Sequence, residues 1–293
     1  MKDILPPLKT LGTVSARFIS ELQQSGSSTF TLEKASAVYG KGHHETTKFL
    51  CKLIERGIIA RIKSGVYIIL QMGQESVQLD NWPLIARELA APNDYFISHY
   101  SAMRLHGMTT HPLFDITITT FKRKNVKEVS NITYHTMFER KNIKKKSNMT
   151  YHFIYSKPEH FWGSSVHWIT NQNKVNVSDL ERTLLDGLAR PDLCGGIKEI
   201  VRGIWVKQKN IDWEKMVTYA ERFHTKAAVK RLGFILEVFE LGLDYIPSLL
   251  RIITTSKGFI FLDPDGMKEG NYLSRWRVRL NINIEELKMG VWE

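Results

Sequence analysis

Along the first quarter of the chain, apolar residues recur every three or four positions, the spacing that places them on one side of an α-helix. This spacing predicts three short helices, over residues 8–24, 31–40 and 43–56. Thr31 is placed to cap the second helix, and Gly40 is placed to end it. Two β-branched runs follow at residues 58–62 and 65–70, joined by Lys63-Ser64-Gly65. These runs predict a β-hairpin.

Beyond residue 80 the pattern changes from helical to alternating and back again. A helix is opened by Asn81-Trp82-Pro83, and another runs from Ser98 to Gly107. From Asp115 apolar and polar residues alternate, which is typical of strands. Further strands are predicted at residues 131–138, 149–155, 165–170 and 174–177. After Ser178, which forms a capping box with Glu181, helices are predicted at 179–189, 197–206, 212–223, 225–241 and 245–253, with a short strand at 259–262.

This order of elements predicts an α+β fold in two domains. Residues 1–75 have the helix–helix–helix–hairpin order of a winged helix-turn-helix, a DNA-binding module. Residues 80–293 form a larger mixed α/β domain, with room for a subdivision near residue 175.

The composition is that of an ordinary globular protein. Of 293 residues, 43% are hydrophobic and 24% charged, which excludes wholesale disorder and low-complexity classes. No apolar run approaches the ~18 residues of a membrane span, and the first residues lack the apolar core of a signal peptide. Cys51 and Cys194 are too few for a disulfide framework or a four-thiolate zinc site. We therefore expect a cytoplasmic protein with no membrane partner, no metal and no cofactor.

The charge distribution indicates a class of ligand, because the chain is basic and its excess of positive charge is concentrated in two segments. The formal net charge is +11, and most of it lies in residues 1–73, which carry +5, and residues 121–157, which carry +8. A run of like charge is usually a solvated face. Two separate basic blocks on an otherwise balanced chain nevertheless favour contact with phosphates. Neither block lies on a strongly amphipathic basic helix, so DNA is favoured over a membrane surface.

The helix predicted from His43 is the candidate recognition helix for a DNA major groove. Its outward and leading residues are hydrogen-bond donors and small hydroxyls, and the hairpin adds two cations for phosphates. The predicted DNA-contacting residues are Lys41, His43, His44, Thr46, Thr47, Lys48, Lys52, Arg61 and Lys63. An alternative interpretation is a protein-interaction module whose helices do not bind DNA.

The mid-chain basic block carries two further hypotheses. Its cations lie between predicted strands, where they would form a second phosphate-binding surface of Lys122, Arg123, Lys124, Lys127, Lys144, Lys145 and Lys146. The same region contains Asp115 and Glu139-Arg140-Lys141, which have the form of a D…ExK nuclease motif. In that motif the two acids hold Mg²⁺ and the lysine orients the attacking water. Because Glu-x-Lys is common in basic stretches, the Mg²⁺-dependent nuclease stays the alternative, and we expect no enzyme.

Two other polar groups are expected to be structural. His99 and His106 lie seven residues apart, about 10.5 Å along a helix, which is too far to share one metal ion. Each is therefore expected to bind core or backbone partners. Glu181, Arg182 and Asp186 are spaced to pair with one another on their helix.

The order and spacing of three stretches resemble the AbiEi family, the antitoxins of type IV toxin–antitoxin systems involved in phage defence. The first is Lys63-Ser64-Gly65-Val66-Tyr67, and the second is Ser98-His99-Tyr100-Ser101-Ala102 with His106-Gly107. The third begins at Ser178, continues through Glu181-Arg182-Thr183-Leu184-Leu185-Asp186 and is followed by Gly195-Gly196. Together these stretches span most of the chain.

The resemblance implies a fold and a function. It implies an N-terminal winged helix-turn-helix that binds double-stranded DNA at the promoter of its own operon and represses it. It also implies a C-terminal antitoxin domain that counteracts a nucleotidyltransferase-like toxin, directly or indirectly. We therefore expect a DNA-binding transcriptional repressor that acts as an antitoxin.

Overall fold

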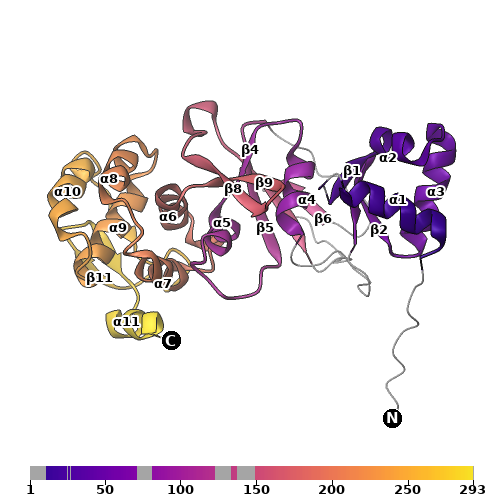
Figure 1. The fold of residues 1–293 in the computed structure, drawn as a ribbon. Coiled ribbons are helices and arrows are strands. Elements are labelled where there is room, and N and C mark those ends of the chain that lie inside the picture. Colours follow the sequence, from indigo (N-terminus) through magenta and orange to yellow (C-terminus); the bar gives the residue numbers. More distant parts are fainter. Residues whose placement is uncertain are drawn as a thin grey trace, which may run out of the picture.

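The structure is a computed structural model that describes residues 11–70 except Ser25 and Ser27, residues 81–122, 133–136 and 149–292. Over these residues the fold is mixed α/β, with 11 α-helices and three β-sheets, as expected for an α+β protein. Figure 1 shows an elongated molecule with an N-terminal helical module at one end, a sheet in the middle and a helical region at the other end. The predicted domain boundary at residues 75–80 falls outside the described residues.

The N-terminal module contains the predicted helices and hairpin. Its elements are α1 (Thr13–Gln24), β1 (Thr29–Thr31), α2 (Leu32–Tyr39), α3 (His43–Glu55), β2 (Ile59–Lys63) and β3 (Val66–Ile69). The capping predictions are confirmed: the Thr31 side chain accepts a hydrogen bond from the Lys34 backbone N–H, and Gly40 ends α2 with a φ of 70°. Strand β1 was not predicted, because three residues are too few to show an alternating pattern. The three strands pair antiparallel in the order β1-β3-β2.

Both faces of this small sheet are covered. On one face Ile59, Tyr67 and Ile69 pack with the buried side chains of α1 and α3. On the other face Ile62, Val66 and Ile68 join the core that contains α4 (Trp82–Ala90). The hairpin therefore connects the N-terminal module to the rest of the molecule.

The central sheet has six strands in the order β6-β7-β5-β4-β9-β8. They are β4 (Tyr95–Ile97), β5 (Asp115–Thr120), β6 (Thr133–Thr136), β7 (Thr150–Tyr155), β8 (Ser164–Thr170) and β9 (Asn173–Ser178). The alternating pattern of β5 suggests one exposed face, but both faces are buried: Thr117 and Thr119 are buried, as are Ile116 and Ile118. The Thr117 hydroxyl donates to the Ser98 carbonyl oxygen, and the Thr119 hydroxyl donates to Ser98 Oγ. Ser98 precedes α5 (His99–Leu105), which packs on this sheet and on α6.

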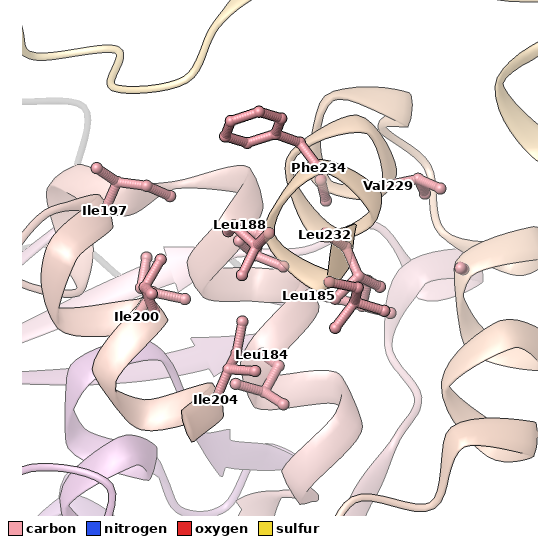
Figure 2. Packing of buried hydrophobic residues seen from close by; sticks show 14 of the residues in the cluster. Leu184, Leu185, Leu188, Ile197, Ile200, Ile204, Val229, Leu232 and Phe234 are labelled. Atoms are coloured by element: carbon pink, nitrogen blue, oxygen red, sulfur yellow. The ribbon is translucent and has the colours of Figure 1, made fainter. Parts of the chain in front are cut away.

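The C-terminal region is mainly helical. Its helices are α6 (Leu180–Ala189), α7 (Ile197–Lys207), α8 (Trp213–Arg222), α9 (Lys226–Val238), α10 (Ile246–Ile253) and α11 (Ile284–Trp292), and it also holds β10 (Ile260–Phe261), β11 (Asn271–Leu273) and β12 (Val278–Leu280). Helix α6 is central: Figure 2 shows its leucines Leu184, Leu185 and Leu188 between the isoleucines of α7 and the apolar side chains of α9. Strands β11 and β12 and helix α11 were not predicted.

The start of α6 differs from the predicted capping box. The N-cap is Asp179, whose carboxylate accepts from the Arg182 backbone N–H, and not Ser178. Ser178 still belongs to β9, is fully buried, and its hydroxyl bonds to that of Thr183 at 2.7 Å. Glu181 pairs with Lys215 of α8 at 2.7 Å. The predicted box is wrong because the strand extends one residue further than its apolar pattern shows.

Among the described residues, no helix combines the length and the apolar content needed to cross a membrane.

Candidate nucleic-acid interface

Helix α3 lies at the outer end of the N-terminal module, away from the central sheet (Figure 1). Its buried positions are Thr46, Leu50 and Leu53, which face α1 and the small sheet. At 100° per residue, the opposite side of the helix carries His44, Lys48 and Lys52 in a row at intervals of four. All three are exposed. We call these three residues the α3 donor row; it is about 12 Å long, given a rise of 1.5 Å per residue.

Charge around the α3 donor row is mainly positive. From Lys41 to Lys63 the chain has six Lys and Arg residues against two glutamates, Glu45 and Glu55. Within the described part of the chain, neither Lys48 nor Lys52 has a carboxylate in salt-bridge range. Because these ammonium groups are exposed and have no acidic partner, they are available to an anionic ligand.

The structure corrects the prediction that Thr46 faces outward. Thr46 is fully buried, and its hydroxyl donates to the carbonyl oxygens of Lys41 and Gly42 at 3.2 and 2.9 Å. It therefore fixes the turn that begins α3 and presents nothing to a ligand. Thr47 is exposed, although its hydroxyl donates to the His43 carbonyl oxygen at 2.7 Å. The exposed Cys51, one residue before Lys52, also lies on this surface and was not among the predicted DNA-contacting residues.

The turn before α3 leaves backbone donors available. Gly42 is the N-cap, and it has no side chain to bond the first N–H groups of the helix. Lys41, His43 and His44 are all exposed at this end. Helix N-termini attract anions because their N–H groups and the helix dipole both favour negative charge. These residues therefore form one continuous exposed surface with the α3 donor row.

The hairpin contributes less to this surface than predicted. Lys63 Nζ donates to the carbonyl oxygens of Glu88 and Ala91 at the end of α4, the second at 3.1 Å. Burial lowers the pKa of Lys63. Its ammonium group thus caps a helix C-terminus, where positive charge is favourable, and it does not point to solvent. Arg61 remains exposed on β2, with its Nε donating to the Lys63 carbonyl oxygen.

Most of the second phosphate-binding surface lies outside the described residues. Of its seven cations, the structure describes Lys122, which is exposed and lies 5.9 Å above the Phe121 ring. Arg123, Lys124, Lys127, Lys144, Lys145 and Lys146 lie outside the described ranges.

The proposed nuclease motif is also described only in part. Asp115 is exposed at the start of β5, where its carboxylate is 3.0 Å from His152 Nε2. Glu139 and Lys141 lie outside the described residues. In the described ranges, no three His, Cys, Asp or Glu side chains gather as metal ligands would.

The two central histidines have the structural partners that were expected. His106 Nε2 donates to the Ser178 carbonyl oxygen at 2.7 Å, and His99 Nδ1 lies 3.0 Å from Ser98 Oγ. Burial lowers the pKa of both imidazoles. His99 also has a φ of 53°, an uncommon backbone conformation for a residue with a side chain.

Comparisons with known proteins give the fold and no function. No family model matches the chain, and no curated protein matches it. Among solved structures, the RV2827C protein from Mycobacterium tuberculosis is similar, with a TM-score of 0.66 and 13% sequence identity over 99% of each chain. At that identity the likeness concerns the fold alone.

Proposed function

We propose that residues 11–70 are a winged helix-turn-helix that binds double-stranded DNA through α3, and that the chain is a transcriptional repressor of its own operon. The observation that carries this proposal is the α3 donor row: His44, Lys48 and Lys52 are exposed at the outer end of the molecule. A helix of 13 residues with donors on its outer side has the size and chemistry to enter a major groove.

The element order supports this proposal independently of charge. Helices α2 and α3 are joined by the tight turn at Gly40-Lys41-Gly42, and the β2–β3 hairpin follows directly. In this arrangement the second helix of the pair is the one that reads DNA. Arg61, on the exposed side of β2, is placed to contact a phosphate beside the groove.

The antitoxin role of the proposal depends on the sequence resemblance to the AbiEi family. In this role, residues 80–293 counteract a nucleotidyltransferase-like toxin, directly or indirectly. A toxicity assay tests it: co-expression of the chain with the product of the adjacent reading frame should restore growth. Continued growth arrest would contradict the antitoxin role while leaving DNA binding intact.

DNA binding is tested with a duplex from upstream of the chain's own reading frame. Lys48→Ala should weaken binding to all duplexes, because an ammonium–phosphate contact carries no sequence information.

Thr47→Ala should leave affinity for unrelated duplexes unchanged and, if Thr47 meets a base edge, relax preference at one position. Lys63 binds the end of α4, whereas Lys41, Lys48, Lys52 and Arg61 are exposed and can each contact a phosphate. Log K should therefore fall with log salt at a slope of about −3.6 per module.

The matched control is Lys209→Ala, in the C-terminal region, which removes one exposed lysine far from α3 along the chain. It should leave the salt slope and the affinity unchanged. Equal binding by the parent chain and by Lys48→Ala would show that α3 is not the recognition helix. Absence of any gel shift with the upstream duplex would favour a protein-interaction module instead.

A further inference from the structure

One face of the small C-terminal sheet presents a row of aromatic and cationic side chains to solvent. The strands lie in the order β10-β12-β11, so β12 is in the middle. Phe261 on β10 and Tyr272 on β11 are both in register with Arg279 on β12. The Arg279 guanidinium lies 5.1 Å from the Phe261 ring centroid and 5.0 Å from that of Tyr272.

Two more side chains extend this row. The Phe259 ring meets the Tyr272 ring edge to face, with centroids 5.0 Å apart. Lys268 Nζ lies 5.2 Å from the centroid of the Phe261 ring. We call these five residues, Phe259, Phe261, Lys268, Tyr272 and Arg279, the aromatic face.

The side chains of the aromatic face are not needed to fill the hydrophobic core, because side chains on the opposite side of the same strands already pack into it. Val278 and Leu262 are fully buried, and Ile260, Leu273 and Leu280 pack against the same core. The outward positions are therefore not needed for this core, and yet they carry large aromatic rings: Phe259 is 44% exposed and Tyr272 is 60% exposed. Exposed aromatic rings that touch one another on a solvated sheet indicate a binding surface.

The charge of the aromatic face is positive. In the described part of the chain, Arg279 contacts two rings and the Gly270 carbonyl oxygen, with no carboxylate in salt-bridge range. The neighbouring turn carries Asp263 and Asp265, but both stand near the largely buried Arg231. Glu269 follows Lys268 directly in the chain.

We propose that the aromatic face binds single-stranded nucleic acid, with bases stacked on Tyr272 and Phe259 and phosphates held by Arg279 and Lys268. A flat ring can accept a base only when that base is unstacked from its neighbours, so the ligand is a single strand and not a duplex. Neighbouring strands are about 4.8 Å apart, and alternate residues on one strand are about 6.7 Å apart. The face is therefore large enough for two or three nucleotides.

This site is separate from the proposed duplex-binding helix and does not depend on it. The C-terminal sheet and α3 lie at opposite ends of the molecule (Figure 1). A chain with both sites would hold duplex DNA at one end and a single strand at the other.

The test is fluorescence anisotropy of the full-length chain with labelled 12-nucleotide single strands, one of DNA and one of RNA. Tyr272→Ala and Phe259→Ala should each weaken binding roughly tenfold, because each removes a stacking surface for one base. Tyr272→Phe keeps the ring and should bind within about twofold of the parent. Arg279→Ala should weaken binding and reduce the salt slope by about one. A tighter complex with RNA than with DNA would identify a site that uses the 2′-hydroxyl.

Two variants are the controls. Trp168→Ala removes a ring that is 61% exposed on β8 and should leave single-strand binding unchanged. Lys48→Ala should lower the affinity for duplex DNA. In a Lys48→Ala background, Tyr272→Ala should weaken single-strand binding by the same factor as in the parent background, which separates this site from the proposed function. A thermal unfolding midpoint equal to that of the parent chain establishes that each variant keeps the fold.

Equal single-strand binding by the parent and Tyr272→Ala would overturn the proposal, as would no binding by the parent. A second overturning result is a change in sedimentation from dimer to monomer in Tyr272→Ala, because the face would then be an interface between two copies of the chain.

Discussion

At the scale of single residues, Arg182 shows how a buried charge is made tolerable. Its Nε donates to Asp186 at 2.9 Å, and its Nη1 donates to the carbonyl oxygens of His160 and Trp162. The guanidinium also lies 4.4 Å from the Trp162 ring centroid. The Arg182 and Asp186 side chains are only 4% and 8% exposed. Removing one partner from such a pair leaves an unpaired buried charge.

Arg182→Ala should therefore destabilise the chain by about 3–5 kcal/mol. Equilibrium urea unfolding measures the loss. The matched control is Arg190→Ala, which breaks an arginine–aspartate pair with Asp192 whose side chains are 48% and 38% exposed. That pair should contribute about 0–1 kcal/mol. Equal losses in the two variants would contradict the burial argument.

At the scale of elements, α9 depends on a glycine that its sequence pattern does not explain. Gly233 lies in the middle of the helix, where alanine is normally favoured by about 1 kcal/mol. A Cβ atom at this position would stand 2.0 Å from the nearest atom of the Trp276 ring, and Trp276 is 1% exposed. The Trp276 indole N–H donates to Glu237, one turn further along α9. The glycine is what lets the loop before β12 pack this closely.

Gly233→Ala should destabilise the chain by about 1–3 kcal/mol, because the added methyl group must displace the indole. Gly290→Ala is the matched variant: it also lies in a helix, α11, and a Cβ there meets no atom within 4 Å. It should stabilise the chain by up to about 1 kcal/mol. Thermal unfolding of both variants checks the opposite signs, and the same sign for both would show that close packing at Trp276 is not the cause.

At the scale of the whole molecule, the hairpin of the N-terminal module contributes side chains to two hydrophobic cores, with Ile59, Tyr67 and Ile69 in the core of that module. Ile62, Val66 and Ile68 of the hairpin belong to the core of the central sheet. Lys63 adds its bonds to α4, and Arg87 of α4 donates to Thr29 Oγ1 in β1. The position of α3 relative to the central sheet is therefore held by apolar packing and by hydrogen bonds together.

Acidification should weaken the fold as a whole, because histidines buried as neutral groups resist protonation. Burial lowers the pKa of His106, His99 and His224 from an ordinary value of 6.5. Below pH 6.5 the unfolded chain takes up protons that the folded chain does not, so stability is full above that pH and falls as the pH drops. The urea midpoint should accordingly decrease between pH 7.5 and pH 5.

His106→Gln isolates one of these contributions, since the amide can still donate to the Ser178 carbonyl oxygen but does not titrate in this range. The urea midpoint of this variant should decrease less steeply with falling pH than that of the parent. An identical pH dependence would mean that His106 is protonated as readily in the folded chain as in the unfolded one.

The repeating pattern of apolar residues was enough to predict α1, α2, α3 and the hairpin, because a period of three and four or of two depends only on neighbouring residues. Capping by Thr31 and Gly40 was predictable for the same local reason. Strands β11 and β12 were missed because each has three residues. A strand that short shows too few alternations to be distinguished from a loop.

The candidate site divides in the same way. The sequence alone determined that α3 carries donors at His44, Lys48 and Lys52, since their spacing places them on one side of any helix. Only the tertiary structure decided that Lys63 binds carbonyl oxygens 25 and 28 residues away in the chain, and that Thr46 is buried beneath its own turn. It alone brought Phe261, Tyr272 and Arg279 into one row, because register between separate strands is set by packing, which no local pattern contains.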